Sequence, residues 1–274
     1  MKDIIYISDF FEDEIIGGAE LSDGVLINYL KEEGHNVKTV KSQTFNPIIH
    51  KADTFIVSNF VGLSEQNKNW FISSRSKYII IERDQKYVRS RNTAMYNNFI
   101  APPSEVVNQT FYRGADKVYC LTMHSANLIL RHIDLTNVEP LGCTQFSQEQ
   151  FDHIRSTYKE TKNGKWCIIP GKRSNKAIQL CETQKIPYDY LKNYKWKDLI
   201  NVISEYEGIV FFSHAVETCC RLILEARMLG LKVKTDNRVG CTYEDWFGKY
   251  KGKELIDFLE TKNFEILDKI QKQL

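Results

Sequence analysis

Two glutamates, Glu217 and Glu225, have the spacing in this 274-residue chain that points most directly to chemistry. Seven residues separate them, in a segment typical of a strand, a loop and a helix. We expect Glu217 just ahead of the helix and Glu225 about two turns into it, with both carboxylates directed at a ligand near the helix N terminus. Carboxylates accept hydrogen bonds from the paired hydroxyls of a sugar. His214 precedes Glu217 in the same loop and is either a further ligand contact or a structural histidine.

A second candidate site is the basic loop that follows the predicted strand 166–170. It contains Gly171, Lys172 and Arg173, with Lys176 at the start of the next predicted helix. Cations at the end of a strand can neutralise a diphosphate leaving group through charge-assisted hydrogen bonds, so no metal or other cofactor is required. The alternative is a solvated lysine-rich loop.

A third candidate is the glycine pair Gly17 and Gly18, which opens a predicted helix that stops at Gly34. Backbone without side chains lets a ligand approach closely, and the helix N terminus favours anions such as a diphosphate. The alternative is a plain turn into a helix.

The elements that would position these residues form two series of strands alternating with helices. The first has predicted strands at 4–8, 37–40, 54–58, 78–82 and 117–122, and the second at 166–170, 208–213 and 231–235. Alternation of this kind predicts parallel sheets covered by helices, with ligands beyond the carboxyl ends of the strands. A polar stretch at 137–165, with Pro and Gly breakers, indicates the boundary between domains 1–150 and 151–274. The last stretch, 252–274, is read as one or two amphipathic helices that can pack back on the first domain.

Composition sets broad limits on the function. The chain is 42% hydrophobic and 26% charged, with a formal net charge of +2, so bulk charge demands neither nucleic acid nor a membrane. The seven cysteines form no CxxC pair, which favours reduced thiols. Because no signal peptide and no apolar run of about 18 residues is present, we expect a cytoplasmic protein.

Taken in order, these segments resemble glycosyltransferase family 4, whose signature is a pair of glutamates with this spacing. The Gly-Gly-Ala-Glu helix start at 17–20, the strand and Ser-containing loop at 115–125, and the Pro-Leu-Gly connector at 140–142 are similar to units of that family. Two features depart from it: the basic loop is one residue shorter, with Lys172 replacing arginine, and Glu82-Arg83-Asp84 stands where a His-Asp pair is common.

The resemblance implies a GT-B fold, with two Rossmann-like domains whose parallel sheets face a central cleft. It implies a retaining, metal-independent transferase that uses a nucleotide-diphosphate sugar, for which UDP-glucose is the first candidate to test. Glu225 would hold the donor ribose and Glu217 the transferred sugar, while Gly18 would meet the diphosphate from the other domain. Lys176 would bind the diphosphate together with Lys172 or Arg173.

The resemblance assigns acceptor binding to the N-terminal domain, and the candidate residues there are Arg83, Asp84 and His124. Cations interleaved with tyrosines at 75–96 suit either a pocket for a glycan or glycoconjugate or a phosphate backbone, so a phage-type transferase acting on a hydroxymethylated base in DNA stays open. A non-catalytic GT-B-like binding module is the third interpretation. A nucleotide-binding oxidoreductase is disfavoured, because no GxGxxG follows a strand. The donor base and sugar, the acceptor and the oligomeric state are not fixed by these residues.

Overall fold

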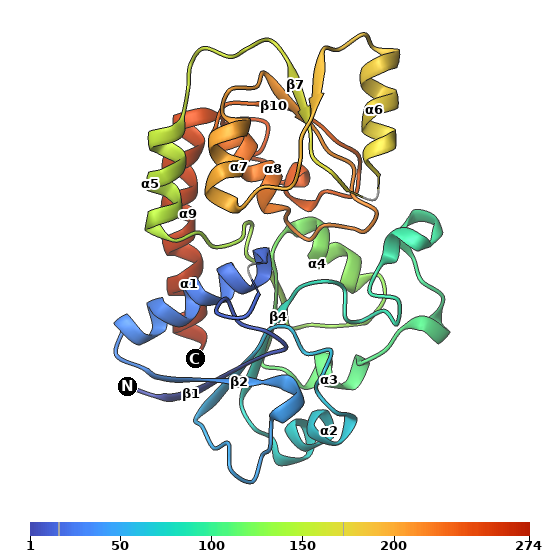
Figure 1. Cartoon of the computed structure of the whole chain (residues 1–274). Helices are drawn as coiled ribbons and strands as arrows, with labels where there is room; N and C mark the ends of the chain where they lie inside the picture. The colour runs from blue at the N-terminus through green and yellow to red at the C-terminus, as the bar shows by residue number, and fades with distance from the viewer. Residues whose placement is uncertain (16, 172) are drawn as a thin grey trace. The chain divides into compact units, whose positions relative to one another are not determined.

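The computed structural model describes residues 1–15, 17–171 and 173–274, and these form two compact units. The N-terminal unit comprises Met1–Gln145 together with Asn263–Leu274, and the C-terminal unit comprises Phe146–Lys262. Each unit is built from a parallel sheet and helices (Figure 1), so the predicted α/β class is confirmed. Lys172, one of the predicted site residues, lies outside the described residues.

The N-terminal unit has a parallel sheet with the strand order β2-β1-β3-β4-β5-β6. Its central strands are apolar and buried along their length, as expected for strands covered on both faces. The strands are β1 (Asp3–Ser8), β2 (Asn36–Lys41), β3 (Thr54–Val57), β4 (Tyr78–Glu82), β5 (Lys117–Cys120) and β6 (Val138–Pro140). The α-helices are α1 (Gly18–Glu32), α2 (Glu65–Ser74), α3 (Gln109–Gly114) and α4 (Met123–Leu130). Short 3₁₀ helices lie at η1 (Ser42–Thr44), η2 (Thr93–Met95), η3 (Asn97–Phe99) and η4 (Pro103–Glu105).

Aromatic side chains fill much of the core of this unit. Phe71 lies at the centre of the cluster, with ring centroids 5.1 Å from Phe55, 5.3 Å from Phe45 and 5.9 Å from Phe111. Tyr78, at the start of β4, stacks on Phe111 at 5.0 Å, and its hydroxyl donates to the Phe111 carbonyl. Large buried rings of this kind fix the positions of β3, β4 and α2, and thereby the loops that leave them.

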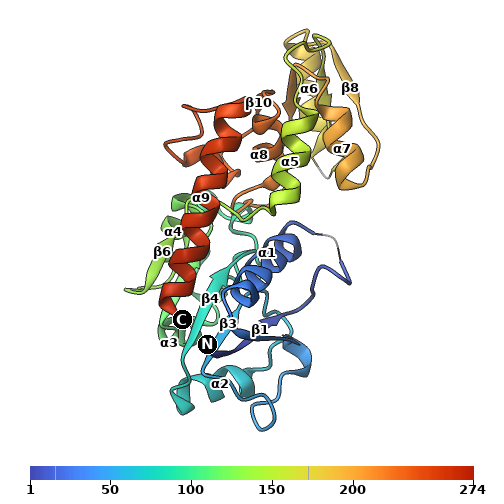
Figure 2. The same cartoon turned by 90° about the vertical axis from the view of Figure 1, so that its left-hand side faces the viewer.

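The end of the chain packs on the N-terminal unit. Helix α9 (Gly252–Gln273) is a single helix, and its last residues belong to this unit. Lys269 pairs with Glu139 of β6 at 2.9 Å, and Tyr29 of α1 donates to Gln271 at 2.9 Å. Figure 2 shows this part of α9 beside β6 and α1. The helix thus covers strands and a helix that are distant from it in sequence.

The C-terminal unit has a smaller parallel sheet with the order β10-β9-β7-β8. Its strands are β7 (Trp166–Ile168), β8 (Tyr188–Tyr190), β9 (Gly208–Val210) and β10 (Lys232–Lys234). Its helices are α5 (Gln148–Thr157), α6 (Ser174–Thr183), α7 (Trp196–Ile203) and α8 (Arg221–Met228), with a 3₁₀ helix η5 (Gly240–Tyr243). Buried Ile168 and Val210 of neighbouring strands pack against Ala177 and Cys181 of α6. This contact fixes the start of α6 at the carboxyl end of β7.

Strands β6 and β8 and helix α5 are among the elements that the sequence pattern does not indicate. Strands β6 and β8 are three residues long and lie at the edges of their sheets, so neither has the continuous apolar run that marks a central strand. Helix α5 lies inside the stretch read as a polar boundary. Its start is fixed by a capping box between Ser147 and Gln150, which a purely apolar pattern does not register.

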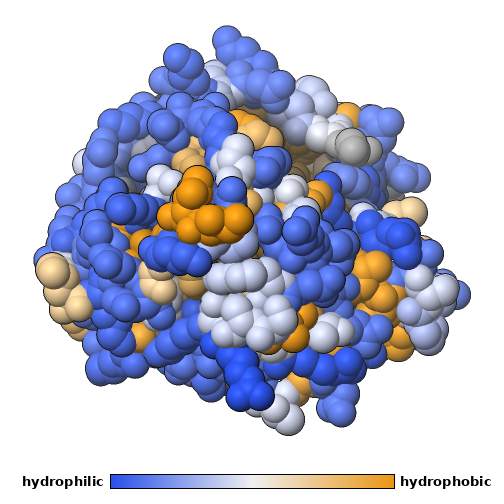
Figure 3. Space-filling view, turned by 90° about the horizontal axis from the view of Figure 1, so that it is seen from below, coloured by the Kyte–Doolittle hydropathy of each residue, from blue (hydrophilic) through white to orange (hydrophobic). Residues whose placement is uncertain are grey.

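The surface in Figure 3 is mostly hydrophilic, with separate hydrophobic areas. The large exposed apolar side chains include Ile48 and Ile49, which are 79% and 69% exposed in the loop between η1 and β3. No helix in the described part of the chain is long and apolar enough to span a membrane.

Candidate functional site

The basic loop of the C-terminal unit connects β7 to α6, at the carboxyl end of the sheet. Arg173 occupies the N-cap position of helix α6, and Lys176 lies in its first turn. A Cβ built on Gly171 would meet no atom within 4 Å, so the backbone there borders open space. The structure therefore brings Arg173 and Lys176 together at the edge where ligands of parallel sheets bind.

Asp236 joins these two cations. Its Oδ2 lies 2.9 Å from Arg173 Nη1 and 3.2 Å from Lys176 Nζ. The Lys176 ammonium also lies 4.3 Å from the centre of the Phe212 ring, a cation–π contact. The Arg173 and Lys176 side chains are 24% and 45% exposed, so both can be reached from solvent. Two positive charges thus share one carboxylate.

The loop after β9 contacts the same ion-pair cluster through its backbone carbonyls. Arg173 donates to the Ser213 carbonyl at 2.9 Å, and Arg238 donates to the carbonyls of Ser213 and His214 at 3.3 and 3.1 Å. The His214 side chain itself is exposed. Arg238 was not predicted from the sequence, and only its place after β10, two residues beyond Asp236, could have drawn attention to it.

Glu217 is held by both its backbone and its side chain. It pairs with Val239 in an isolated parallel bridge, in which its N–H donates to the Arg238 carbonyl at 2.7 Å. Ser213 Oγ donates to Glu217 Oε1 at 2.7 Å. The carboxylate is therefore oriented by Ser213, a residue of the same loop that follows β9.

Glu225 is placed differently, because its side chain is almost fully buried. The residue is 3% exposed and lies one turn into α8, which begins at Arg221, rather than two turns as expected. Trp196 Nε1 donates to Glu225 Oε1 at 2.9 Å, and Arg221 Nε lies 3.7 Å away. Burial raises the pKa of Glu225, while the charge of Arg221 and the hydrogen bond from Trp196 oppose this shift.

Cys220 lies between the two glutamates in sequence, at the residue before α8. It precedes α8 with a positive φ of 69°. Burial raises the pKa of the Cys220 thiol well above its usual range, and the charges of Glu217 and Glu225 raise it further.

In the N-terminal unit, Gly17 and Gly18 stand at the start of α1, as predicted. A Cβ at position 17 would lie 2.3 Å from Glu20 Oε2, because the flexible Glu20 side chain folds back toward the helix start. Burial raises the pKa of Glu20, and the nearby charges of Asp23 and Asp84 add to the shift. This helix N terminus thus already faces carboxylates.

The predicted acceptor-side residues occupy three different environments. Arg83 is buried and pairs with Asp23 at 2.9 Å, and Tyr6 and Ser58 donate to the same Asp23 oxygen. Asp84 is exposed and has a positive φ of 57°. Burial, with a smaller effect of Arg131, lowers the pKa of His124 to about 4, so its imidazole is neutral at pH 7.

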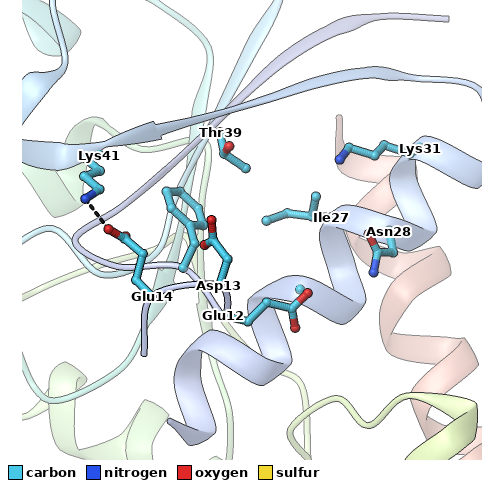
Figure 4. A pocket seen from close by; sticks show the side chains of 10 residues that line it. Glu12, Asp13, Glu14, Ile27, Asn28, Lys31, Thr39 and Lys41 are labelled. Atoms are coloured by element: carbon cyan, nitrogen blue, oxygen red, sulfur yellow. Dashed lines mark hydrogen bonds and ion pairs between the residues drawn. The ribbon is translucent and has the colours of Figure 1, made fainter. Parts of the chain in front are cut away.

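A pocket of about 390 Å³ lies beside the acidic loop between β1 and α1; we call it the acidic-loop pocket. Figure 4 shows Glu12, Asp13 and Glu14 along it with Lys31 and Lys41, and Glu14 pairs with Lys41 at one side of it. Three acids against two cations leave no excess of positive charge, so this pocket does not favour an anion. Within the described ranges, no group of three or more His, Cys, Asp or Glu side chains is arranged to hold a metal ion.

The sequence matches no protein-family model and no curated protein. Solved structures of the same architecture do match. They include Anabaena Alr3699/HepE in complex with UDP and glucose (11% identity, TM-score 0.53, 100% of this chain and 92% of that chain). AviGT4, a glycosyltransferase involved in avilamycin A biosynthesis, matches at 10% identity and a TM-score of 0.52 over 100% of this chain and 97% of that chain. An alpha-glucosyltransferase in complex with UDP matches at 10% identity and a TM-score of 0.50 over 97% of this chain and 95% of that chain.

At these identities the likeness establishes the fold. The chain has the glycosyltransferase-like GT-B fold, with a parallel sheet in each of two Rossmann-like domains, as the resemblance implied.

Proposed function

We propose that this protein is a retaining, metal-independent glycosyltransferase, which moves a sugar from a nucleotide-diphosphate sugar to a hydroxyl of a glycan or glycoconjugate. The observation that carries the proposal is the pairing of Arg173 and Lys176 on Asp236, at the carboxyl end of β7 and beside the Glu217 loop. Two structures of this fold contain UDP, which supports a uridine donor such as UDP-glucose.

The donor diphosphate would take the place of Asp236 as the partner of both cations. Charge-assisted hydrogen bonds of this kind contribute roughly 1.5–3 kcal/mol each. Helix α6 adds its N-terminal N–H groups and dipole to the same end. Which of Lys172 and Arg173 contacts the phosphates stays open in this proposal, while Lys176 is assigned in either case.

The two glutamates would bind the sugar and the ribose. Glu217, oriented by Ser213, is half-buried and would accept hydrogen bonds from hydroxyls of the transferred sugar. His214, exposed in the same loop, would be a further donor contact. Glu225 would accept hydrogen bonds from the ribose hydroxyls in addition to the one that Trp196 donates to its Oε1, because a carboxylate has about four acceptor sites.

The reaction breaks the bond between the anomeric carbon and the leaving phosphate oxygen and forms one to the acceptor oxygen. For retention without a covalent intermediate, the acceptor attacks from the leaving-group side, and the departing phosphate oxygen takes the acceptor proton. Retaining glycosidases instead use two carboxyl groups about 5 Å apart as acid and nucleophile. In the proposed mechanism Glu217 is no nucleophile, and stabilisation of the developing phosphate charge contributes most to the rate enhancement.

The N-terminal unit would supply the acceptor side through Asp84 and the neutral imidazole of His124. Arg83 would act indirectly, because its guanidinium is buried against Asp23 and holds the turn that presents Asp84. Gly18, at the start of α1, would offer its backbone N–H to the diphosphate.

The test is transfer of isotope from a panel of UDP- and GDP-sugars to a glycan mixture, plain DNA and hydroxymethylated DNA, with released sugar counted. Label in glycans supports the proposal. Label in modified DNA alone would mean that the acceptor is a hydroxymethylated base and not a glycan. Release or isomerisation of the donor sugar without any transfer would contradict transferase activity. No turnover of any donor would leave a binding module as the better account.

A further inference from the structure

A second pocket of the N-terminal unit, which we call the basic pocket, has a volume of about 350 Å³. It lies among the loops that follow β3 and β4, with the first residues of α2 and the residues just before α3. Phe60, 1% exposed, contributes a ring to it. The pocket is therefore at the carboxyl end of the sheet, where ligands of parallel α/β units bind.

Four cations line this pocket, and two of them are buried. The side chains of Lys68 and Lys86 are 9% and 2% exposed, and their ammonium groups lie 5.8 and 5.3 Å from the centre of the Phe60 ring. Arg89 and Arg91 are exposed at the same pocket. One acid, Glu65, lines the pocket, and two more carboxylates lie beside its cations, Glu105 at 3.8 Å from Arg89 and Glu82 at 3.9 Å from Lys86. Four cations against three carboxylates leave a positive excess of one.

Both buried lysines retain donor capacity. Lys68 donates to Glu65 at 2.7 Å and to Asn108 at 2.9 Å, and Lys86 donates to the Arg83 carbonyl. Since an ammonium has three N–H donors, each lysine keeps at least one for a ligand. Lys86 also lies 3.9 Å from the buried Glu82, whose two carboxylate oxygens accept hydrogen bonds from Lys86 N and from the Tyr112 hydroxyl.

The pocket is held in shape before a ligand arrives. Lys86 follows two residues with positive φ, Asp84 at 57° and Gln85 at 54°. The buried Gln85 side chain accepts from Thr93 N at 2.7 Å, and Asn108 donates to the Lys86 carbonyl at 2.7 Å. Fixed donors reduce the ordering cost of binding, so the pocket is suited to a small, specific anion.

We propose that the basic pocket binds the phosphate group of a phosphorylated small-molecule acceptor, such as a sugar phosphate. That this ligand is the acceptor rests on the proposed transferase function; that the pocket binds phosphate does not. A phosphate monoester carries a charge of roughly −1.5 to −2 and three acceptor oxygens, which suit the positive lining and the donors that Lys68 and Lys86 retain. A volume near 350 Å³ is at the lower end of small-molecule sites, about 300–1,000 Å³.

Nucleic acid fits these observations less well. Backbone phosphates of DNA are contacted by exposed Lys and Arg along a surface. In the basic pocket the exposed cations are Arg89 and Arg91, whereas Lys68 and Lys86 are recessed over Phe60. A terminal phosphate reaches recessed donors more easily than a phosphodiester flanked by two sugars.

Calorimetric titration of the whole chain with inorganic phosphate and glucose 6-phosphate, with glucose as the uncharged comparison, tests the binding claim. We expect both phosphates and not glucose to bind, with a loss of about tenfold or more in Lys86→Met and about three- to fivefold in Arg91→Ala. Arg91 is exposed, so its variant keeps the test valid where Lys86→Met does not fold. Lys41→Ala, in the acidic-loop pocket, is the matched control and should bind as the parent does. Absence of phosphate binding, or equal loss in the control, would overturn the proposal.

Label transfer then tests the acceptor claim. Transfer to a phosphorylated sugar that greatly exceeds transfer to its unphosphorylated form, and that falls in Arg91→Ala, supports it. Equal transfer to both forms, or transfer to hydroxymethylated DNA that depends on Arg91, would overturn it. Phosphate binding that depends on Lys86 and Arg91 in a protein that turns over no donor would support the binding claim and contradict the transferase function.

Discussion

The two units each carry a pair of cations beside an aromatic ring at the carboxyl end of a sheet, but they hold these cations differently. In the C-terminal unit, Lys176 lies over Phe212 and is 45% exposed, and it shares Asp236 with Arg173 through direct ion pairs. In the N-terminal unit, Lys68 and Lys86 lie over Phe60 and are largely buried.

This difference separates two uses of a positive charge. Exposed cations that share a carboxylate can exchange it for a diphosphate and return to it after product leaves, which suits a group that must be released in every cycle. Buried cations fixed by backbone and amide contacts cannot rearrange as freely, so they suit recognition of a group that stays unchanged. Substitution of Arg173 or Lys176 should therefore lower turnover, whereas substitution of Lys68 or Lys86 should weaken phosphate binding and lower stability.

The largest effect is expected for Lys176→Ala. By analogy with removing one preorganised donor from an oxyanion site, turnover should fall on the order of 100-fold or more. The melting temperature should stay close to that of the parent, because this side chain is nearly half exposed and surface ion pairs contribute little. Steady-state kinetics with the best donor and a thermal melt measure both quantities.

Lys159→Ala is the matched control for that experiment. Lys159 also makes an exposed ion pair in the C-terminal unit, with Glu205 at 2.7 Å, and lies between α5 and β7 rather than in the loop after β7. Turnover should be unchanged in this variant. Full activity of a folded Lys176→Ala protein would remove Lys176 from the mechanism.

A smaller effect, on stability, is expected for Trp196→Phe. The substitution removes the N–H donor from the buried Glu225 carboxylate, and leaving such a group less satisfied costs about 1–3 kcal/mol of unfolding free energy. It also removes a contact that lowers the pKa of Glu225, so that pKa should rise further. The indole is partly exposed, so lost packing contributes less.

The sign of the pH dependence follows from the raised pKa. A carboxyl whose folded-state pKa lies above its unfolded value, near 4.3 for glutamate, contributes stability below that unfolded value and loses it as pH rises through the folded pKa. The deficit of Trp196→Phe should therefore be large at pH 8 and small near pH 4, as measured by urea unfolding. In a Glu225→Gln background this pH dependence should disappear. An equal deficit at both pH values would mean that the indole acts through packing alone.

Much of the fold was readable from the sequence, because the central strands are apolar on both faces and leave a strong signal. Strand β4 was predicted at its observed bounds, and α1 at its observed start after Gly17. The edge strands β6 and β8 were missed, since three residues at a sheet edge carry no such pattern. The sequence predicts the start of α8 soon after Glu217, but the helix begins at Arg221. Cys220 precedes it with a positive φ, which cannot be predicted from a cysteine in the sequence.

The candidate site was readable only in part. The spacing of charged residues along the chain indicated Lys176, Arg173 and the two glutamates. It could not indicate partners that come from other elements, such as Asp236 after β10 or Trp196 at the start of α7, because these contacts depend on how the sheet orders its strands. The hydrogen bond that Trp196 donates to Glu225 appears only in three dimensions.

The smallest effect is expected for Asp236→Asn, and it tests whether the shared carboxylate competes with the donor. Removing its charge frees Arg173 and Lys176 from ion pairs worth about 0.2–1 kcal/mol each, so UDP should bind roughly two- to fivefold more tightly, measured by calorimetry at low salt. Turnover should not rise in parallel, because product release becomes slower when Asp236 no longer reclaims the cations. Asp189→Asn is the control, since Asp189 forms an exposed pair with Lys165 in the same unit. Weaker UDP binding in Asp236→Asn would instead mean that Asp236 positions the two cations for the donor. The cations of the two units would then both be held in place, and they would differ only in how far they are exposed to solvent.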